Sequence, residues 1–567
     1  MLTTMKRNNF LTYALLMALP LTGGTFFSAC TDGFDELNTN QIQVNPGDLP
    51  FAAQCTEPMT YCYPPQQNMF QFWTNLTIDL YGGYFMTPNG NFTNGDMGEN
   101  RGHSGGMYEN YYLHIFNNTR RIIADCDAKG EKGISGVMRI VQAYGTLMTT
   151  DAYGPIPYSS ILSGENEVYF EFDSQKDLYK AMLNDLSKAI TDISAMQNDE
   201  VLKLKSFDCW CNGDKDLWVK VANTMRLRMA LRLSKREAEA ASAGMDLKAI
   251  ATEAAANTLA TVNKDILINK NLENEMWLMF NWGDCGFNAN LVTLMSGMKD
   301  PRQPLYMTYN TGDILNEAGN KVIDKNTTYL GMRFASGLPP KSNSWGSFSG
   351  WIQGENGSSY TMPLPIMKAA ESYFLLAEAK LRWDIGSQSV QQLYEEGIRV
   401  SMANELAYRG SYAGVKGYPE GAVEAYINGT TTQIDYTDPV RAELSTPAVN
   451  HLCVKWDEAA SKEEKLERII TQKWLALFPL STEGWAEQRR TGYPRFFPAF
   501  VNESNGGVNT EEGVRRVIYS SQAYDANAQG VAGGIELLNA ENSSKTGISG
   551  DKGGTRLWWD NADKGNF

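Results

Sequence analysis

The chain has 567 residues, 43% of them hydrophobic and 11% aromatic, with a formal net charge of −15 and a pI near 4.9. This composition predicts a large buried core. The acidic balance, with no cluster of Lys and Arg, argues against nucleic acid as a partner, because phosphate binding needs a basic face.

The N-terminus has the order of a secretory signal. Lys6 and Arg7 precede an almost wholly apolar run that ends in small residues before Cys30. The run is shorter than the roughly 20 residues that span a bilayer, and polar residues follow it, so we expect it to be removed. We predict a lipoprotein signal peptide over 1–29, lipid on Cys30, and a tether over 30–48. The alternative is a nearby cut by ordinary signal peptidase, which leaves Cys30 as an N-terminal thiol.

The remaining seven cysteines give a weaker signal. They are Cys55, Cys62, Cys126, Cys209, Cys211, Cys285 and Cys453. Cys55 and Cys62 are the favoured candidates for a disulfide. The Cys209-Trp210-Cys211 spacing lacks a second ligand pair, so buried thiols are a better interpretation than a metal or redox site. With three histidines in the chain, neither a His-based metal site nor a triad is indicated, and we expect no cofactor.

Six segments place apolar residues at helical spacing. In chain order they are 133–149, 174–193, 218–236, 367–383, 390–405 and 462–478. Ser174 is the expected N-cap of the second segment. The pair 367–383 and 390–405, joined by a short turn, has roughly the length of a tetratricopeptide unit. The sequence therefore predicts a mostly α fold built from helical pairs and structured turns.

Two long stretches, 59–112 and 281–360, interrupt this pattern with weak periodicity. They are rich in Gly, Asn, Trp and Tyr. Long irregular segments usually carry function or are disordered, and the aromatic content favours order here. Because no Pro- or Ser-rich linker divides the chain after the tether, we expect a single domain over 49–567.

Short motifs run through the chain in a fixed order. They are Cys30–Asn38, Thr150–Tyr158, Gly213–Asn223 with Arg226–Arg232, Asp300–Arg302, Glu371–Ala379, Gln472–Trp474, Trp485–Pro494, Arg515–Tyr519 and Thr555–Asp560. Taken together, in this order, they resemble the SusD/RagB family. Each motif alone is a weak signal, whereas the ordered series is a strong one.

The resemblance implies a specific role. Family members are outer-membrane lipoproteins at the cell surface, with a mostly helical fold that contains tetratricopeptide-like pairs and long irregular loops. They cap a SusC-like TonB-dependent transporter as a hinged lid and bind nutrient without catalysis. We therefore expect an oligosaccharide-binding protein that is not an enzyme, anchored in the outer membrane and facing outward. An oligopeptide-binding lid of the same transporter type is the alternative. The sequence shows no nucleophile elbow, P-loop or metal-ligand motif.

We interpret the family motifs as structural. Thr150–Tyr158 combines Gly and Pro in a defined turn, and Arg489 and Arg490 are expected to pair with acidic residues of neighbouring helices. A motif shared by the whole family cannot easily specify a ligand that differs among its members. Specificity should therefore lie in the irregular stretches.

A search rule for sugar binding follows from the chemistry of the ligand. The C–H face of a pyranose lies on an exposed Trp or Tyr, while its hydroxyls need amide and carboxylate partners. Both irregular stretches combine such residues, including Asn75, Asn89 and Asp284. Our candidate ligands are Trp73, Asp79, Tyr81, Tyr84, Asn281, Trp282, Trp345 and Trp351. The alternative for each aromatic residue is a place in the core, which is the commoner role in a large helical protein.

Overall fold

The computed structural model describes residues 49–567, apart from 66, 164–168 and 270–271. The predicted lipidation residue Cys30, with the signal peptide and tether around it, lies outside the described residues. Phe51–Phe567 forms one compact unit. None of the described helices is long and apolar enough to cross a bilayer.

The first part of this unit is almost wholly helical. Its elements are α2 (Phe51–Tyr61), α3 (Gln67–Phe70), the π-helix η2 (Gln71–Ile78), α4 (Asp79–Tyr81), β1 (Phe85–Met86), the 3-10 turn η3 (Thr93–Asp96), α5 (Arg101–Asn110), the π-helix η4 (Tyr111–Phe116), α6 (Asn117–Lys129), α7 (Lys132–Tyr153), α8 (Ser159–Ser163), α9 (Gln175–Ser194), α10 (Asn198–Lys205), α11 (Lys215–Arg232), η5 (Ser234–Arg236), α12 (Glu237–Ser242), α13 (Leu247–Ala255) and η6 (Leu259–Thr261).

The middle part mixes short strands with short helices. It contains β2 (Ile266–Ile268), α14 (Glu275–Trp282), β3 (Gly286–Phe287), α15 (Ala289–Met298), α16 (Gln303–Tyr306), β4 (Met307–Asn310), β5 (Ile314–Leu315), β6 (Lys321–Ile323), η7 (Ser344–Ser347), β7 (Ser349–Trp351), η8 (Glu355–Thr361) and β8 (Leu364–Met367). The strands form four two-stranded antiparallel sheets, β1 with β3, β2 with β8, β4 with β7 and β5 with β6.

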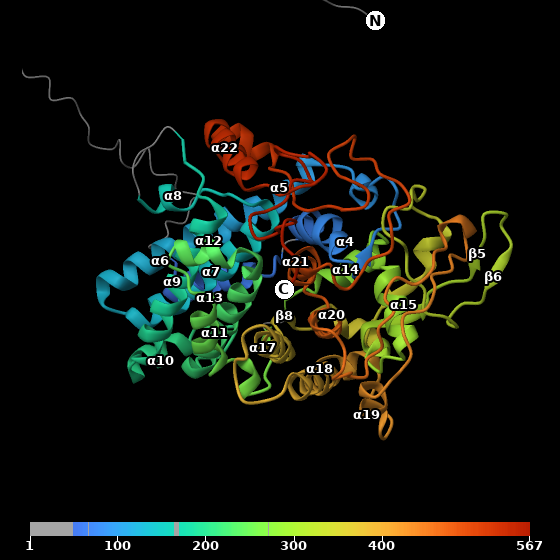
Figure 1. The fold of residues 1–567 in the computed structure, drawn as a ribbon, viewed down its shortest axis with the longest axis horizontal. Coiled ribbons are helices and arrows are strands. Elements are labelled where there is room, and N and C mark those ends of the chain that lie inside the picture. The colour runs from blue at the N-terminus through green and yellow to red at the C-terminus, as the bar shows by residue number, and fades with distance from the viewer. Residues whose placement is uncertain (1–48, 66, 164–168, 270–271) are drawn as a thin grey trace, which may run out of the picture. The chain divides into compact units, whose positions relative to one another are not determined.

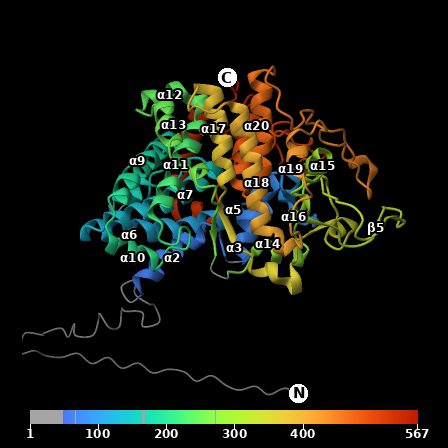
Figure 2. The same cartoon turned by 90° about the horizontal axis from the view of Figure 1, so that it is seen from below.

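Long helices return in the last part. They are α17 (Ala369–Trp383), α18 (Val390–Ala413), α19 (Ala422–Ile427), α20 (Lys462–Leu477), α21 (Ser481–Thr491) and α22 (Ser521–Glu541), with the 3-10 turn η9 (Ala442–Leu444) between α19 and α20. Figures 1 and 2 show α17, α18 and α20 side by side, and each of the three packs against the other two.

The helices of the first part pack against one another largely in chain order. α7 lies against α6 and α9, α9 against α11, and α11 against both α13 and α17 (Figure 1). This arrangement confirms the predicted mostly α fold of helical pairs. Apolar stripes on successive helices are buried against one another, which stabilises such an array.

All six predicted helices are present, with shifted ends. Ser174 caps α9 as expected, since its hydroxyl accepts a hydrogen bond from the backbone N–H of Asp177 at 3.1 Å. The third helix begins earlier than predicted because Asp214 caps it, and it ends at Arg232 instead of 236. The fifth continues past residue 405 to Ala413, where Gly414 adopts a left-handed C-cap.

The interpretation of 59–112 as irregular was wrong. Most of this stretch is helical, but residues 71–78 form a π-helix, and a second π-helix over 111–116 begins at its end. A π-helix bonds each residue to the fifth one along the chain and not to the fourth. Apolar residues in such segments therefore miss the 3.6-residue spacing by which helices are recognised. The second stretch, 281–360, contains the helices α15 and α16 as well as short strands, joined by loops.

The expected Cys55–Cys62 disulfide is absent. All seven cysteines in the described part of the chain are free thiols. Cys55 lies in α2 and Cys62 directly follows it, and the Cys62 thiol donates to the carbonyl oxygen of Pro58 at 3.4 Å. Burial raises the pKa of the Cys62 thiol, which disfavours the reactive thiolate.

Family motifs that lie far apart in the chain meet in a buried ion network. Five cations, Arg228, Arg232, Arg382, Lys473 and Arg490, face five carboxylates, Asp151, Glu371, Glu378, Glu483 and Glu487. These residues come from α7, α11, α17, α20 and α21, so the network joins helices from the first part of the unit to helices from the last part. The structural interpretation of these motifs agrees with this placement.

The two consecutive arginines of α21 have different surroundings. Arg490 donates to both oxygens of Glu378, each at 2.7 Å, as the pairing prediction requires. Arg489 instead donates to the carbonyl oxygen of Arg515 at 2.8 Å, and its guanidinium lies 3.5 Å from the centroid of the Trp485 ring. Burial lowers the pKa of Arg489 to about 9. The acidic partner predicted for Arg489 is therefore replaced by backbone carbonyls and a tryptophan face.

Candidate ligand-binding surface

The two stretches expected to carry specificity meet in space. β1 and β3 pair antiparallel, with Phe85 opposite Phe287 and Met86 opposite Gly286. One residue further along, the backbone N–H of Asn288 donates to the carbonyl oxygen of Tyr84 at 2.9 Å. This short sheet fixes the loops on either side of it against each other.

Next to this sheet lies the Asp284 cluster, which comprises Asp284, Gln71, Asn89 and Lys341. The largely buried carboxylate of Asp284 accepts a hydrogen bond from Gln71 Nε2 at 3.3 Å and one from Asn89 Nδ2 at 3.3 Å. Lys341 Nζ lies 3.0 Å from Asp284 Oδ1. A single carboxylate thus orients two amides and one ammonium group, and all four side chains belong to the stretches 59–112 and 281–360.

The π-helix η2 positions one side of the Asp284 cluster. Gln71 is its first residue, and Asn75, one turn later, donates from Nδ2 to the backbone carbonyl oxygen of Asp284 at 3.2 Å. π-helical turns occur frequently at functional sites, because they turn side chains away from the ordinary helical positions. The same feature that hid this segment from sequence prediction therefore places two amides against Asp284.

The end of α14 presents Trp282 to solvent. Gly283 adopts a left-handed conformation with φ of 72°, which ends the helix and turns Asp284 inward. Trp282 keeps 37% of its surface exposed, and Asn281 beside it is exposed as well. The surface around the Asp284 cluster therefore combines an open indole with amide, carboxylate and ammonium groups. An aromatic face with polar groups beside it suits the C–H face and the hydroxyls of a pyranose ring.

A pair of aromatic residues, separate from Trp282, joins α14 to η8. The rings of Trp277 and Tyr360 meet edge to face with centroids 5.0 Å apart, and Tyr360 is 38% exposed. The Tyr360 hydroxyl donates to Glu273 at 2.7 Å. Asn281 donates to the carbonyl oxygen of Trp277 at 2.6 Å, one helical turn back. These contacts hold the exposed face of α14 in a fixed arrangement.

Five of the eight candidate ligands lie in the core. Trp73, Asp79, Tyr84, Trp345 and Trp351 are each at most 4% exposed. Tyr84 packs on Trp474 with ring centroids 4.5 Å apart and donates its hydroxyl to the Trp474 carbonyl oxygen at 2.5 Å. Trp345 Nε1 donates to Asp438 at 3.0 Å. In this arrangement the buried rings have no open face for a sugar, because neighbouring side chains cover them.

Asp79 shows why a carboxylate in an aromatic stretch need not be a ligand. Its side chain is fully buried and accepts a hydrogen bond from the Ser481 hydroxyl, while its second oxygen has no partner among the described residues. Burial raises the pKa of Asp79 to about 7, against the lowering effect of the Ser481 hydrogen bond. This carboxylate belongs to the contact between α4 and α21.

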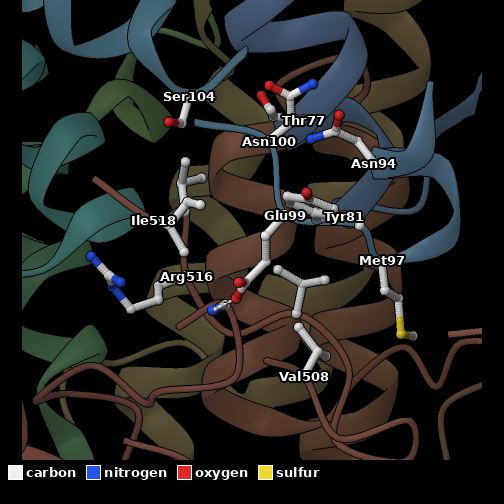
Figure 3. Close-up of a pocket in the computed structure, with 14 residues that line it drawn as sticks. Thr77, Tyr81, Asn94, Met97, Glu99, Asn100, Ser104, Val508, Arg516 and Ile518 are labelled. Carbon is white, nitrogen blue, oxygen red and sulfur yellow. Dashed lines mark hydrogen bonds between the residues drawn. The ribbon is translucent and has the colours of Figure 1, made fainter. Parts of the chain in front are cut away.

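Tyr81 is the third candidate that keeps some exposure. Its ring is half-buried, 5.3 Å from the centroid of Trp485 and 6.1 Å from that of Phe334. Figure 3 shows it in a small pocket with Asn94 and Glu99 close to it. That pocket encloses about 20 Å³, room for about one water molecule. Burial raises the pKa of Tyr81 to about 12, so its hydroxyl remains a neutral donor.

The structure thus divides the predicted set. Asn281 and Trp282 are exposed at the end of α14, just before Asp284 in the chain, Tyr81 lies by a separate cavity, and the other five are buried. Sequence reasoning missed Gln71 and Lys341. The only sequence feature that points to Gln71 is its position two residues before Trp73, and the only one that points to Lys341 is its position after two prolines. No group of three or more His, Cys, Asp or Glu side chains in the described ranges could hold a metal ion.

Comparison with known proteins identifies the family. A family model described as SusD-like, of SusD and RagB outer membrane lipoproteins, matches residues 35–560. The chain belongs to the SusD/RagB family of outer membrane lipoproteins. The predicted resemblance and the outer-membrane location are confirmed by this match, and SusD-like proteins bind their ligands without being enzymes. A search of curated proteins finds no match.

Solved structures of SusD homologues have the same fold. A chitin-binding SusD homologue from Flavobacterium johnsoniae is 28% identical, with a TM-score of 0.76 over 91% of this chain and 99% of the other. A SusD-like protein from Bacteroides thetaiotaomicron is 27% identical, with a TM-score of 0.73 over 90% and 98% of the two chains. A homologue from Bacteroides vulgatus is 27% identical, with a TM-score of 0.75 over 90% and 98%. The predicted SusD-like helical fold is confirmed.

Proposed function

We propose that this SusD-family protein binds an oligosaccharide at the surface formed by Trp282 and the Asp284 cluster. One sugar ring lies on the exposed indole of Trp282, and its hydroxyls are bound by the groups that Asp284 orients. The observation that carries the proposal is the exposed Trp282 next to a carboxylate that holds two amides and a lysine. The chitin-binding relative supports a glycan as the ligand class.

The proposal includes a partner. Members of the family cap a SusC-like TonB-dependent transporter in the outer membrane, and we propose that this chain passes its oligosaccharide to such a barrel as a hinged lid. Lipid on Cys30 would keep the lid attached while it opens and closes. Family membership supports both parts of this proposal. Co-purification of a TonB-dependent barrel with the tagged chain from native outer membranes tests the partner.

The ligand class is tested by isothermal titration calorimetry of the full chain in detergent. The titrants are neutral oligosaccharides, including oligomers of glucose and of N-acetylglucosamine, and a matched set of short peptides. We expect binding of at least one oligosaccharide, with a loss of about tenfold or more in affinity for Trp282→Ala, since stacking on one aromatic ring contributes roughly 1–3 kcal/mol in comparable ring contacts. Tyr309→Ala is the matched control, because Tyr309 is also exposed, at 44%, on strand β4. If only peptides bind, the proposed glycan ligand is wrong and the oligopeptide alternative holds.

A further inference from the structure

A separate cavity of about 450 Å³ lies between Tyr81 and the segment 496–514. We name it the Tyr81 pocket. Its volume falls in the range of roughly 300–1,000 Å³ that is typical of small-molecule sites. The exposed residues Thr510 and Glu511 lie on its lining, so the pocket opens to solvent on their side. It shares Tyr81, Met97 and Val514 with the small pocket of Figure 3.

One wall of the Tyr81 pocket is aromatic. Tyr81, Phe334, Trp485 and Phe496 all line it. Arg489 covers one face of the Trp485 indole, with its guanidinium 3.5 Å from the ring centroid, and so holds that ring in place. Aromatic rings arranged in this way offer apolar contact to the C–H face of a sugar.

The asparagines of the pocket fix its shape. Asn290 Nδ2 donates to Asn288 Oδ1 at 2.9 Å, and Asn290 Oδ1 accepts the backbone N–H of Phe497 at 2.8 Å. These bonds join α15 to the segment that closes the pocket. Since both side chains are engaged with each other or with the backbone, the hydrogen bonds open to a ligand must come from other residues.

Three polar side chains of the lining are open to a ligand. Gln488 is half-buried, and its side-chain amide has no hydrogen-bond partner in the described part of the chain. Glu512 Oε1 lies 3.5 Å from Arg556 Nη2, whereas Oε2 is buried and has no partner among these residues. Glu511 is exposed. A buried carboxylate oxygen without a donor is costly and is satisfied when a ligand supplies one.

The charge of the pocket selects among sugars. Glu511 and Glu512 are acidic, and none of the described residues that line it is Lys, Arg or His. Glu512 faces Arg556 through Oε1, so the acidic groups left to a ligand are the Glu511 carboxylate and Glu512 Oε2. These oxygens repel a uronic or sulfated sugar and attract a protonated amine. A charge-assisted hydrogen bond from an ammonium group to a carboxylate is roughly twice as strong as a neutral one.

We propose that the Tyr81 pocket binds one amine-bearing sugar ring, such as a glucosamine unit, with its apolar face on the aromatic wall and its ammonium group on Glu511 and Glu512. Gln488 binds a ring hydroxyl. The pocket excludes acidic sugars. This inference rests on the proposed glycan-binding function and adds a second contact, separate from Trp282, that recognises the charge of the sugar.

The test is calorimetry of the full chain in detergent at pH 6 with trimers of glucosamine, N-acetylglucosamine and galacturonic acid. We expect the glucosamine trimer to bind most tightly and the galacturonic acid trimer not to bind. In the double variant Glu511→Gln/Glu512→Gln, the affinity for the glucosamine trimer should fall about tenfold and that for the N-acetylglucosamine trimer by less than about twofold. Ala499→Phe, which fills the cavity from its rim, should also lower the affinity for the glucosamine trimer about tenfold. Thermal midpoints establish that each variant is folded.

Several results would overturn the inference. One is equal affinity for the galacturonic acid and glucosamine trimers. Another is an affinity for the glucosamine trimer that does not change in either the Glu511→Gln/Glu512→Gln variant or the Ala499→Phe variant. A third is binding of the peptide Gly-Lys-Gly that is lost to the same extent when Glu511 and Glu512 are replaced. If trimers bind in a Trp282-dependent manner while the pocket variants have no effect, this inference fails alone. If no trimer binds any form of the protein, the proposed function fails with it.

Discussion

Arg228 of α11 and Glu371 of α17 form a buried two-point ion pair. Arg228 Nε lies 2.8 Å from Glu371 Oε1, Arg228 Nη2 lies 2.6 Å from Glu371 Oε2, and both side chains are at most 1% exposed. Arg228 also lies 3.2 Å from Glu483, and the two carboxylates outweigh the effect of burial and keep Arg228 charged. The pair therefore links the helices before the irregular middle part to those after it.

Removing one member of this pair should strongly destabilise the protein. Glu371→Ala leaves the Arg228 guanidinium buried without its main partner, which costs about 3–5 kcal/mol in comparable buried pairs. Urea denaturation followed by circular dichroism measures the effect. The double variant Arg228→Met/Glu371→Leu, which removes both charges, should lose much less stability than Glu371→Ala. An equal loss in the single and double variants would contradict this explanation.

The ion network also predicts loss of stability in acid. Burial alone raises the pKa of Glu487, but Arg490, Lys473 and Arg232 outweigh it and hold that pKa well below its usual value. A carboxyl group with a depressed folded pKa contributes stability above its unfolded pKa and loses it as pH falls through the folded value. We therefore expect the free energy of unfolding to decline below about pH 4.5, near the ordinary Glu pKa. Denaturation midpoints that stay constant from pH 6 to pH 3 would contradict the prediction.

Asp79 should show the opposite pH dependence. Burial raises its folded pKa to about 7 from the ordinary Asp value of 3.8, so the unfolded state releases its proton first and stability falls as pH rises between these values. Asp79→Asn removes this penalty, and the variant should gain up to roughly 4 kcal/mol over the natural protein at pH 8, at 1.36 kcal/mol per pKa unit. Near pH 4 the two should differ little. Urea denaturation at both pH values measures the free energy of unfolding of the two proteins. A larger gain in stability for Asp79→Asn at pH 4 than at pH 8 would contradict the proposed effect of burial.

Asp284 should matter more for ligand binding than for folding. Asp284→Ala removes the acceptor shared by Gln71, Asn89 and Lys341, so we expect a loss of affinity for oligosaccharide of about tenfold or more and a loss of stability of about 1–3 kcal/mol. Asp324→Asn is the control, because Asp324 forms an exposed pair with Lys321 at 2.7 Å on the β5–β6 hairpin. Surface pairs of this kind contribute little. Equal affinities for both variants would argue against the cluster.

The N-cap of α9 gives a local test of how sequence sets a helix end. Ser174→Ala removes the hydrogen bond from Asp177 N–H to the Ser174 hydroxyl and should cost about 1 kcal/mol. Ser194→Ala is a control, since Ser194 is an exposed residue at the other end of the same helix and donates to the Ile190 carbonyl oxygen. Denaturant midpoints compare the two. A loss for Ser194→Ala as large as that for Ser174→Ala would contradict the capping role.

Sequence predicted the helices because their buried faces repeat at 3.6 residues, and it predicted the family because the motifs keep their order. It failed in 71–78 because a π-helix does not follow that spacing. Candidate ligands were harder to predict. Composition alone does not distinguish Trp282, exposed by the left-handed Gly283, from Trp351, which is buried against Phe280 and Phe478. Exposure depends on how distant segments pack. For the same reason, Lys341 could not be assigned to Asp284 from sequence.

The central claim is that an oligosaccharide is held at Trp282 and the Asp284 cluster. The most direct test is a crystal structure of the protein soaked with the oligosaccharide that calorimetry shows to bind most tightly. We expect a sugar ring parallel to the Trp282 indole, with ring hydroxyls within hydrogen-bond distance of the Asp284 cluster. A sugar bound elsewhere, with the Trp282 face open to solvent, would contradict it.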